Sequence, residues 1–337
     1  MNPFVTRLFL AVLIFGSHTI LFAQSAGSRG SYTRGGFAGA KYIAFGSAAE
    51  AYSDDVFSIY WNPAGLASLR DDSTKSPEEI RKKTDKGDVS GISEEDLLKF
   101  SDSSDKTTLH LGVSATKADI DHSAFFGGAA VNLLGGALGA GVYSIYSSSI
   151  KEYDTSGNRT GSGVYQGSIG FLSYGRNAGV SSFGVSIKGL HETVSDAKYA
   201  GASCDIGVRA EVLPFIKVGF VAQDLGIGLY PVSGSKLNKK YDFGSPTLRS
   251  SVFIESRATN VSLGLGIARR IEQNTFIYSA GLRYDPTDNI FMSLGFHDES
   301  FTAGAGLKIW KCEVWYAFSY DKINMGYNNS VSLVMVF

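Results

Sequence analysis

Four of the five histidines in the chain, His110, His122, His191 and His297, are the side chains best able to hold a metal ion or to act as a base. No two of them stand four residues apart, the spacing that sets two imidazoles on one face of a helix. A serine hydrolase would need one of them beside a serine, and any long series of strands offers such pairs by chance. We therefore expect no metal, no cofactor and no enzymatic activity.

Two other chemical signals are weak. Gly135 to Gly141 superficially resembles a phosphate-binding loop, but the lysine and the helix that such a loop requires do not follow it. Glycines at this place fit a strand that another segment approaches closely. Cys204 and Cys312 are the only cysteines, which excludes a disulfide scaffold and a cysteine metal cluster and leaves open whether the two pair.

One stretch near the start of the chain, residues 44–67, stands out from the rest. It is rich in small residues, carries the adjacent carboxylates Asp54 and Asp55, and ends in Asn-Pro-Ala-Gly at 62–65, which is typical of a turn. The stretch shows no strand alternation, yet it precedes a long series of strand-like segments. We predict that it forms a plug and that the rest of the chain builds the cylinder around it.

Composition and targeting signals narrow the class of protein. Forty glycines against 7 prolines, with 17 tyrosines and 22 phenylalanines, indicate many strands and tight turns. A formal net charge of -1 gives no sign of nucleic-acid binding. Residues 1–23 have the positive start, apolar run and small residues of a secretory signal peptide. Residues 70–106 hold 19 charges in 37 positions and predict a solvated insertion with two short helices.

From residue 107 onward, apolar residues alternate with small or polar ones at the period of a strand with two unlike faces. Fourteen such segments can be counted, an even number as in single-chain outer-membrane barrels. The segments are 108–116, 124–131, 137–147, 165–174, 182–192, 205–212, 216–223, 248–255, 261–268, 276–284, 290–297, 301–309, 313–320 and 330–337.

The two faces and the connections both favour a barrel in a membrane. One face of the strands is apolar, and the other carries the charges, among them Arg209, Arg249, Arg283 and Lys308. Short turns alternate with longer connections at 150–163, 193–201 and 224–246, as in outer-membrane barrels, whose long loops face outward. We therefore predict an all-β fold, a 14-stranded antiparallel transmembrane β-barrel with an N-terminal hatch in its lumen.

Strands and plug together resemble the FadL-like family of outer-membrane transporters for long-chain fatty acids and other hydrophobic molecules. The resemblance is nearer to the uncharacterised spirochaete-type branch and to PorV/PorQ-type barrels. It covers essentially the whole mature chain and is marked by the terminal Phe337, which resembles the signal read by barrel-assembly machinery. The motif residues that carry it, and that it implies act in the hatch and its gating, are Phe45, Gly46, Asp54, Asp55, Asn62, Pro63, Ala64 and Gly65.

The family implies that a ligand binds in the lumen and leaves sideways through the wall when the hatch moves. Candidates for a ligand lining are Phe57, Ile59, Tyr60, Trp61, Phe253, Phe291 and Trp315. The alternative is that these side chains only pack the hatch against the wall. Because buried carboxylates are costly unless paired, we expect Asp54 or Asp55 to form at least one ion pair with Arg209, Arg249, Arg283 or Lys308.

The chain is thus predicted to have four parts: a signal peptide at 1–23, a hatch at 24–69, a charged periplasmic insertion at 70–106, and the barrel at 107–337. The predicted function is passive transport of hydrophobic small molecules, such as long-chain fatty acids, with hatch-gated lateral exit. The predicted partners are the ligand or a lipid, outer-membrane lipids, the assembly machinery and a periplasmic protein. The alternative is a non-transporting barrel that serves as a protein-docking or secretion-associated scaffold.

Overall fold

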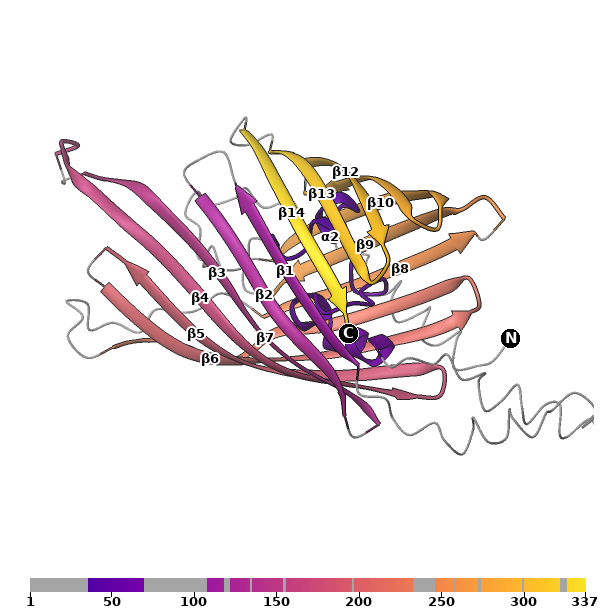
Figure 1. The fold of residues 1–337 in the computed structure, drawn as a ribbon. Coiled ribbons are helices and arrows are strands. Elements are labelled where there is room, and N and C mark those ends of the chain that lie inside the picture. The colour runs from indigo at the N-terminus through magenta and orange to yellow at the C-terminus, as the bar shows by residue number, and fades with distance from the viewer. Residues whose placement is uncertain are drawn as a thin grey trace, which may run out of the picture.

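The computed structural model describes residues 36–69, 108–117, 122–133, 135–153, 156–195, 197–232, 246–256, 258–271, 274–298, 300–321 and 326–337. The predicted signal peptide and charged insertion lie outside these residues. Fourteen antiparallel strands close into a barrel in which each strand pairs with its sequence neighbours and β1 pairs with β14 (Figure 1). The predicted fold class and strand number are confirmed. No helix among the described residues is long and apolar enough to cross a membrane.

The strands are β1 (Leu109–Lys117), β2 (His122–Leu133), β3 (Gly136–Tyr153), β4 (Arg159–Ala178), β5 (Ser181–Val194), β6 (Ala197–Leu213), β7 (Ile216–Pro231), β8 (Thr247–Ser256), β9 (Val261–Arg270), β10 (Thr275–Thr287), β11 (Ile290–His297), β12 (Ser300–Ile309), β13 (Cys312–Asp321) and β14 (Gly326–Val336). Each strand covers its predicted segment, apart from at most about two residues at an end, and several strands extend beyond their predicted segments.

The strands differ greatly in length, and this shapes the wall. Strand β4 has 20 residues and β11 has 8, whereas about 9 to 11 residues cross a bilayer at a tilt. Pairing of β3 with β2 ends at Ser147, and pairing of β7 with β8 ends at Gln223. Beyond these rungs β3–β7 continue alone, as the sheet sweeping to the left in Figure 1. We call residues 148–153, 159–170, 188–194, 197–203 and 224–231 the outer extension.

The outer extension corrects three sequence predictions. The expected long loops at 150–163 and 193–201 are mostly strand, because β3 runs to Tyr153, β4 begins at Arg159, and β5 and β6 are joined at 195–196. The expected loop at 224–246 is strand as far as Pro231. Lys198 is exposed whereas Ala197 and Tyr199 beside it are buried, so the strand alternation continues through a segment whose polar residues were read as a loop.

The short connections all lie at one end of the barrel, which we call the turn end. They join β2 to β3, β4 to β5, β6 to β7, β8 to β9, β10 to β11 and β12 to β13. The first and last strands also meet there, since the backbones of Leu109 and Phe337 bond to each other at 3.3 and 2.9 Å. The opposite end, from which the outer extension projects, is the loop end.

Residues 36–69 lie inside the barrel, as the indigo segment in Figure 1 shows. They contain α2 (Ala40–Ala44), α3 (Ser58–Trp61) and the 3-10 helix η2 (Pro63–Leu69). Nearly every side chain in this segment is buried. The barrel therefore encloses a plug, as predicted, and we call the segment the hatch.

Candidate functional site

The hatch has little regular structure, so side chains of the wall bind much of its backbone. Strands β1, β14 and β8 present Ser114, Ser332 and Ser251, whose hydroxyls accept hydrogen bonds from the backbone N–H groups of Gly39, Ala40 and Ala51 at 3.2, 3.0 and 2.8 Å. Thr302 on β12 donates to the carbonyl of Ala44 at 3.1 Å. Because a buried backbone group without a partner is costly, inward serines and threonines at this level stabilise a non-helical plug.

The Asn-Pro-Ala-Gly motif is the start of η2 rather than an isolated turn. The Asn62 side-chain oxygen accepts a hydrogen bond from the Ala64 N–H at 3.1 Å, which is the contact of a helix N-cap. Its amide donates to the Glu50 carbonyl at 2.7 Å. Pro63 then stands at the first helical position, where a missing N–H costs nothing. Asn62 thus fixes η2 and ties it to the preceding hatch loop.

Glycines of the wall let this motif approach. A Cβ atom built on Gly207 of β6 would overlap the Asn62 side-chain oxygen, and one on Gly184 of β5 would overlap the backbone of Pro63. Within the hatch, Gly46 has φ +66°, a left-handed conformation that favours glycine, and a Cβ there would overlap the Ala280 carbonyl of β10. The predicted hatch residues therefore contact opposite parts of the wall.

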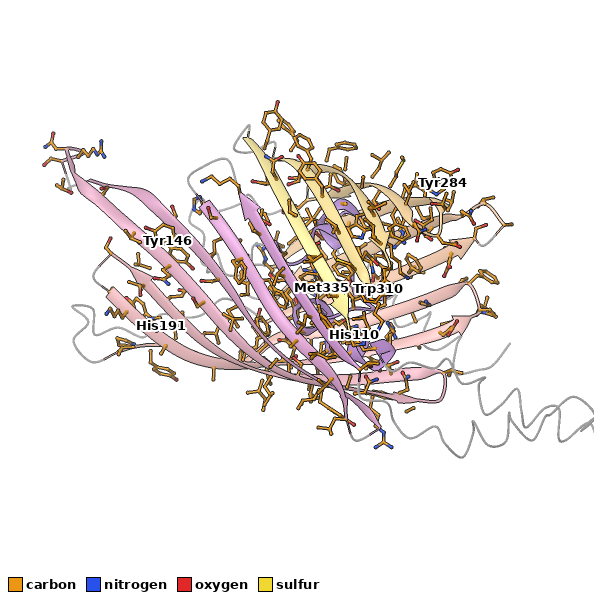
Figure 2. All side chains as sticks on the ribbon, in the orientation of Figure 1. His110, Tyr146, His191, Tyr284, Trp310 and Met335 are labelled. Atoms are coloured by element: carbon orange, nitrogen blue, oxygen red, sulfur yellow. The ribbon has the colours of Figure 1, made fainter. Side chains whose placement is uncertain are left out.

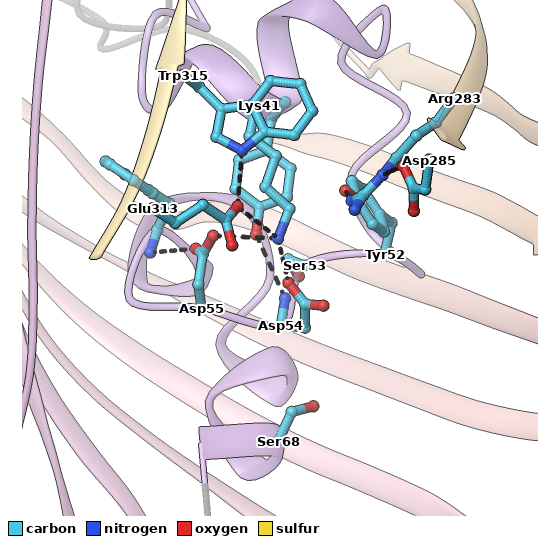
Figure 3. Close-up of polar contacts among 12 residues, drawn as sticks. Lys41, Tyr52, Ser53, Asp54, Asp55, Ser68, Arg283, Asp285, Glu313 and Trp315 are labelled. Carbon is cyan, nitrogen blue, oxygen red and sulfur yellow. Dashed lines mark hydrogen bonds and ion pairs between the residues drawn. The ribbon is translucent and has the colours of Figure 1, made fainter. Parts of the chain in front are cut away.

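Asp54 and Asp55 do form ion pairs, but the predicted partner is wrong. Both pair with Lys41 of α2, whose Nζ lies 2.7 Å from Asp54 and 3.4 Å from Asp55 (Figure 3). Glu313 of β13 lies 3.9 Å from the same Nζ and accepts a hydrogen bond from the Trp315 indole at 2.6 Å. Lys41 was missed because it sits in the glycine-rich segment before the motif, where no spacing rule connects it to the two aspartates.

Burial and the neighbouring charges shift the pKa values of Asp54, Asp55 and Lys41 in opposite directions. Burial raises the pKa of Asp55 to about 6, and nearby Asp54 and Glu313 add to the shift against the attraction of Lys41. Burial would also raise the pKa of Asp54, but Lys41 at 2.7 Å leaves it below its usual value. Burial alone would lower the pKa of Lys41, and the carboxylates around it instead raise it well above its usual value.

The four predicted wall cations serve different partners. Arg249 pairs with Glu50 of the hatch at 2.5 Å. Arg209 donates to the Ser53 carbonyl at 2.7 Å and to Ser68. Arg283 pairs with Asp285 at 2.6 Å and contacts the Tyr52 hydroxyl. Lys308 is exposed at the turn end. Arg249, Arg209 and Arg283 thus bind the hatch, and the last two contact neutral oxygen atoms of it.

The candidate ligand-lining side chains are all buried, and the structure divides them between two clusters. Phe57, Ile59, Tyr60, Trp61 and Phe253 belong to a large cluster that joins the hatch to the wall. Phe291 and Trp315 stack at 5.6 Å in a smaller cluster under α2. The Tyr60 ring contacts those of Trp61, Tyr143 and Phe171 at centroid distances of 5.2 to 6.0 Å. Their contacts are those of packing between hatch and wall.

A polar cavity of about 870 Å³ opens at the turn end, which we call the mouth cavity. Its floor is formed by Lys41, Asp54 and Asp55, and the wall contributes charged groups of both signs. None of the candidate ligand-lining aromatics borders it. The charged wall residues are Arg209, Glu211, Lys217, Lys308, Lys311 and Glu313.

The lumen near the loop end was missed by the sequence analysis. Buried apolar side chains of the outer extension face inward there, namely Tyr165, Ile169, Leu190, Ala197, Tyr199 and Leu229. They could have been found, because the alternation in 159–170 and 188–203 continues that of the adjoining strands. The outer face at this height is mostly polar or small, as Ser162, Gln166, His191 and Lys198 are exposed, and the larger apolar or aromatic exceptions are Val164, Val194 and Tyr230.

A buried charge group marks the rung where β7 and β8 part. Lys188 of β5 lies 2.7 Å from Asp205 of β6 and 2.9 Å from Asp224 of β7. The register of β6 and β7 shifts at this point, and Asp224 has φ 59°. One residue earlier, the Gln223 amide donates to the carbonyls of Tyr60 and Trp61 at 3.0 and 3.3 Å. The irregularity in the pairing of β7 is thus attached to the hatch through the side chain of Gln223.

The histidines are dispersed, as His110 on β1 and His191 on β5 illustrate in Figure 2. Within the described ranges, no group of three histidine, cysteine, aspartate or glutamate residues could hold a metal ion. Cys204 and Cys312 are free thiols on β6 and β13.

No family model matches the sequence, and no curated protein matches it. The fold is similar to that of solved transporters, over nearly their whole length. For the toluene transporter TbuX of Ralstonia pickettii, the identity is 13%, the match covers 88% of this chain and 97% of that chain, and the TM-score is 0.56.

Two further structures agree. For the toluene transporter TodX of Pseudomonas putida, the identity is 10%, the match covers 88% of this chain and 96% of that chain, and the TM-score is 0.58. For a FadL homologue of Pseudomonas aeruginosa, the identity is 10%, the match covers 89% of this chain and 98% of that chain, and the TM-score is 0.51. At such low identity the likeness establishes the fold.

Proposed function

We propose that the protein is an outer-membrane barrel that passively transports hydrophobic small molecules. The observation that carries the proposal is the group of buried apolar side chains on the inner face of the outer extension, which lie beside the buried Lys188 and Glu192, whereas the outer face is mostly polar or small. In a strand that stands in lipid the two faces would be reversed. An apolar inner surface above the membrane is therefore suited to take a hydrophobic ligand out of water.

The membrane position in this proposal is supported by the belt of apolar side chains around the shorter strands. Leu265, Met292, Leu294 and Val331 are each about half exposed on the outside of the barrel. Tyr278, Tyr284, Tyr316 and Trp310 are also exposed, and aromatic side chains of this kind gather at membrane interfaces (Figure 2). In the proposal, the turn end faces the periplasm.

An axial route to the periplasm would be unfavourable for a hydrophobic ligand, because it would pass the charged floor of the mouth cavity at Lys41, Asp54 and Asp55. A lateral route is supported by the rung at Gln223 and Thr247, which is the last one that β7 and β8 share among the described residues and lies at the level where the proposal places the edge of the lipid. Movement of the hatch at Tyr60 and Trp61 would act on this rung through Gln223. We infer that the ligand leaves sideways there, gated by the hatch motif from Phe45 to Gly65.

The resemblance stated above implies long-chain fatty acids as ligands, whereas two of the similar structures are titled toluene transporters. Both are hydrophobic, and our proposal covers both. It also includes recognition of the terminal strand, with Phe337 exposed at its end, by the barrel-assembly machinery.

Uptake into lipid vesicles tests the proposal. Purified barrel is reconstituted, and entry of radiolabelled toluene or oleate from water into the vesicles is measured. Leu190→Asp, which puts a charge on the inner face of the outer extension, should lower uptake about tenfold, the effect of roughly 1.4 kcal/mol on ligand affinity. Gln166→Asp, on the outer face of the adjacent strand, is the matched control and should leave uptake unchanged.

Equal uptake by vesicles with and without the barrel would contradict transport. The scaffold alternative would then gain support if the protein co-purified with a periplasmic partner in a manner that required residues 70–106. A preference for toluene over oleate, or the reverse, would distinguish the two ligand classes.

A further inference from the structure

The hatch spans the lumen between two strand pairs that lie on opposite sides of the barrel. We call the line along which two neighbouring strands pair a seam, and the β7–β8 seam lies halfway round the ring of strands from the β14–β1 seam. At the β14–β1 seam, Ser114 and Ser332 share one rung. Their hydroxyls accept hydrogen bonds from the Gly39 and Ala40 N–H groups. The hatch thus binds both strands of this seam through neutral groups.

At the β7–β8 seam the hatch contacts three successive rungs on the inner side of the wall. From the turn end to the loop end, these rungs are Gly219–Ser251, Val221–Arg249 and Gln223–Thr247. The hatch backbone crosses the first of them. A Cβ atom built on Gly219 would overlap the Glu50 carbonyl. On the facing strand, Ser251 accepts a hydrogen bond from the Ala51 N–H at 2.8 Å. Residues 50 and 51 therefore lie over both strands.

The two rungs nearer the loop end are held by side chains of the wall that reach into the hatch. On β8, Arg249 pairs with the Glu50 carboxylate at 2.5 Å. On β7, the Gln223 amide donates hydrogen bonds to the carbonyls of Tyr60 and Trp61 at 3.0 and 3.3 Å. Each strand is therefore attached to the hatch close to the last rung that the two strands share among the described residues.

These two attachments meet inside the hatch. The Asn62 amide donates to the Glu50 carbonyl at 2.7 Å, so the residue that binds β8 is joined to the segment that binds β7. The Arg249 guanidinium also lies over the Trp61 ring, with 5.1 Å between its central carbon and the ring centroid. Through Glu50 and Trp61, the hatch therefore ties the loop-end part of β8 to that of β7.

Stability alone does not explain why an ion pair stands at this seam. Glu50 is 2% exposed and the Arg249 side chain 14%, so both charges are largely removed from water. Neutral residues of similar size in place of a buried ion pair often keep or raise stability. At the β14–β1 seam, hydroxyl groups bind the hatch. A charged pair holds its two groups in one geometry through strong, directional hydrogen bonds, which suits a contact that sets the position of a strand.

We propose that Glu50 is a positioning residue for lateral exit, which holds the loop-end part of β8 to the hatch and so keeps the β7–β8 seam closed. This inference rests on the proposed function, because it assigns a controlling residue to the exit at this seam. The part of β8 bound by Glu50 is also paired with β9, since Arg249 faces Ala268. When the ion pair breaks, β8 and β9 would therefore move away from β7 together, while the hatch keeps its hydrogen bonds to β14 and β1.

Spin labels on the outer face test this hold without relying on transport. In a Cys204→Ser, Cys312→Ser background, labels are attached at Ala222→Cys and Leu248→Cys, which face each other across the β7–β8 seam. A closed seam keeps the two labels close and broadens their continuous-wave spectrum by dipolar coupling. Parting of the seam removes this broadening.

Two variants remove the ion pair. Glu50→Gln removes one charge and leaves Arg249 uncompensated, so heat-modifiable migration must verify that the barrel is folded. Glu50→Gln combined with Arg249→Gln removes both charges and leaves no unpaired one. Both variants should lose the dipolar broadening at the β7–β8 seam. In vesicles they should raise the maximal rate of uptake about tenfold, because a hydrogen bond between charged groups is lost, and leave the half-saturating ligand concentration unchanged.

Two controls show whether the effect belongs to this seam. Labels at Leu282→Cys and Leu294→Cys, which face each other on β10 and β11, should stay broadened in both variants. Equal loss there would mean that the whole barrel loosens, and would overturn the inference. Asp285→Asn removes the carboxylate that pairs with Arg283, another wall arginine that contacts the hatch, and should change neither the broadening nor the uptake.

The outcomes separate this inference from the proposed function. If the double variant keeps the broadening at the β7–β8 seam while the barrel with the intact ion pair takes up ligand, the inference is overturned and the proposed function stands. Loss of broadening in the double variant, when no barrel takes up ligand, supports the hold of Glu50 on the seam and contradicts the proposed function. A higher half-saturating concentration at an unchanged maximal rate also overturns the inference, because the ion pair would then serve ligand binding.

Discussion

The barrel around the hatch and the outer extension of β3–β7 share one antiparallel ladder but reverse their faces. Around the hatch, Leu294 and Leu265 face outward and small polar residues such as Ser251 face inward. In the outer extension, Gln166 and Lys198 face outward and apolar residues face inward. In the proposed orientation, the reversal marks the edge of the lipid.

The two regions also differ in what fills them. Around the hatch, wall hydroxyls and glycines fit a polar backbone, as at Ser332 and Gly207. In the outer extension, Tyr165 and Tyr199 face inward together with the charged Lys188 and Glu192, and no segment of the hatch packs its backbone on them through wall hydroxyls. One region is therefore built to hold a plug, and the other is suited to a hydrophobic ligand.

The largest expected effect is at the boundary between the regions. Lys188→Ala leaves Asp205, which has no exposed surface, without its cation and should lower the free energy of unfolding by about 3 to 5 kcal/mol. Asp285→Ala, which removes the partly exposed partner of Arg283, should cost less than about 1 kcal/mol. Urea unfolding in lipid vesicles measures both, and equal losses would contradict a buried boundary charge group.

A charge on the outer face distinguishes lipid from water. Leu294→Arg on β11 should cost about 2 to 4 kcal/mol, the effect of arginine at the middle of a bilayer. Ser162→Arg on the outer face of the outer extension should cost about zero, because that face stands in water. Unfolding in vesicles of the same lipid provides the comparison. A similar loss for both variants would mean that the outer extension is covered by lipid.

Close contact between wall and hatch predicts a smaller effect. Gly207→Ala adds a methyl group that overlaps Asn62 and should cost about 1 to 3 kcal/mol. Gly170→Ala is the control, because a Cβ at Gly170 meets no atom within 4 Å. The midpoint of thermal unfolding in detergent should fall for the first variant alone. A normal midpoint for Gly207→Ala would show that the hatch is not seated against β6 at Asn62.

Much of this architecture could be predicted from the sequence. Alternation located all 14 strands, and the lack of alternation at 44–67 located the plug. The outer extension was misread because its outward residues are polar, and polarity alone does not separate a loop from a strand in water. The partner of Asp54 and Asp55 was missed because Lys41 approaches them through the folding of the hatch, which depends on the wall around it.

A reversible cross-link between β7 and β8 tests the central claim, transport with lateral exit, most directly. Ala222 and Leu248 face each other on the rung next to the last shared one, and opposite residues in an antiparallel pair lie within disulfide reach. In a Cys204→Ser, Cys312→Ser background that keeps Gln223, we expect Ala222→Cys with Leu248→Cys to take up the hydrophobic ligand into vesicles when reduced and to lose uptake when oxidised. Equal uptake in the two redox states would contradict a lateral exit between these strands.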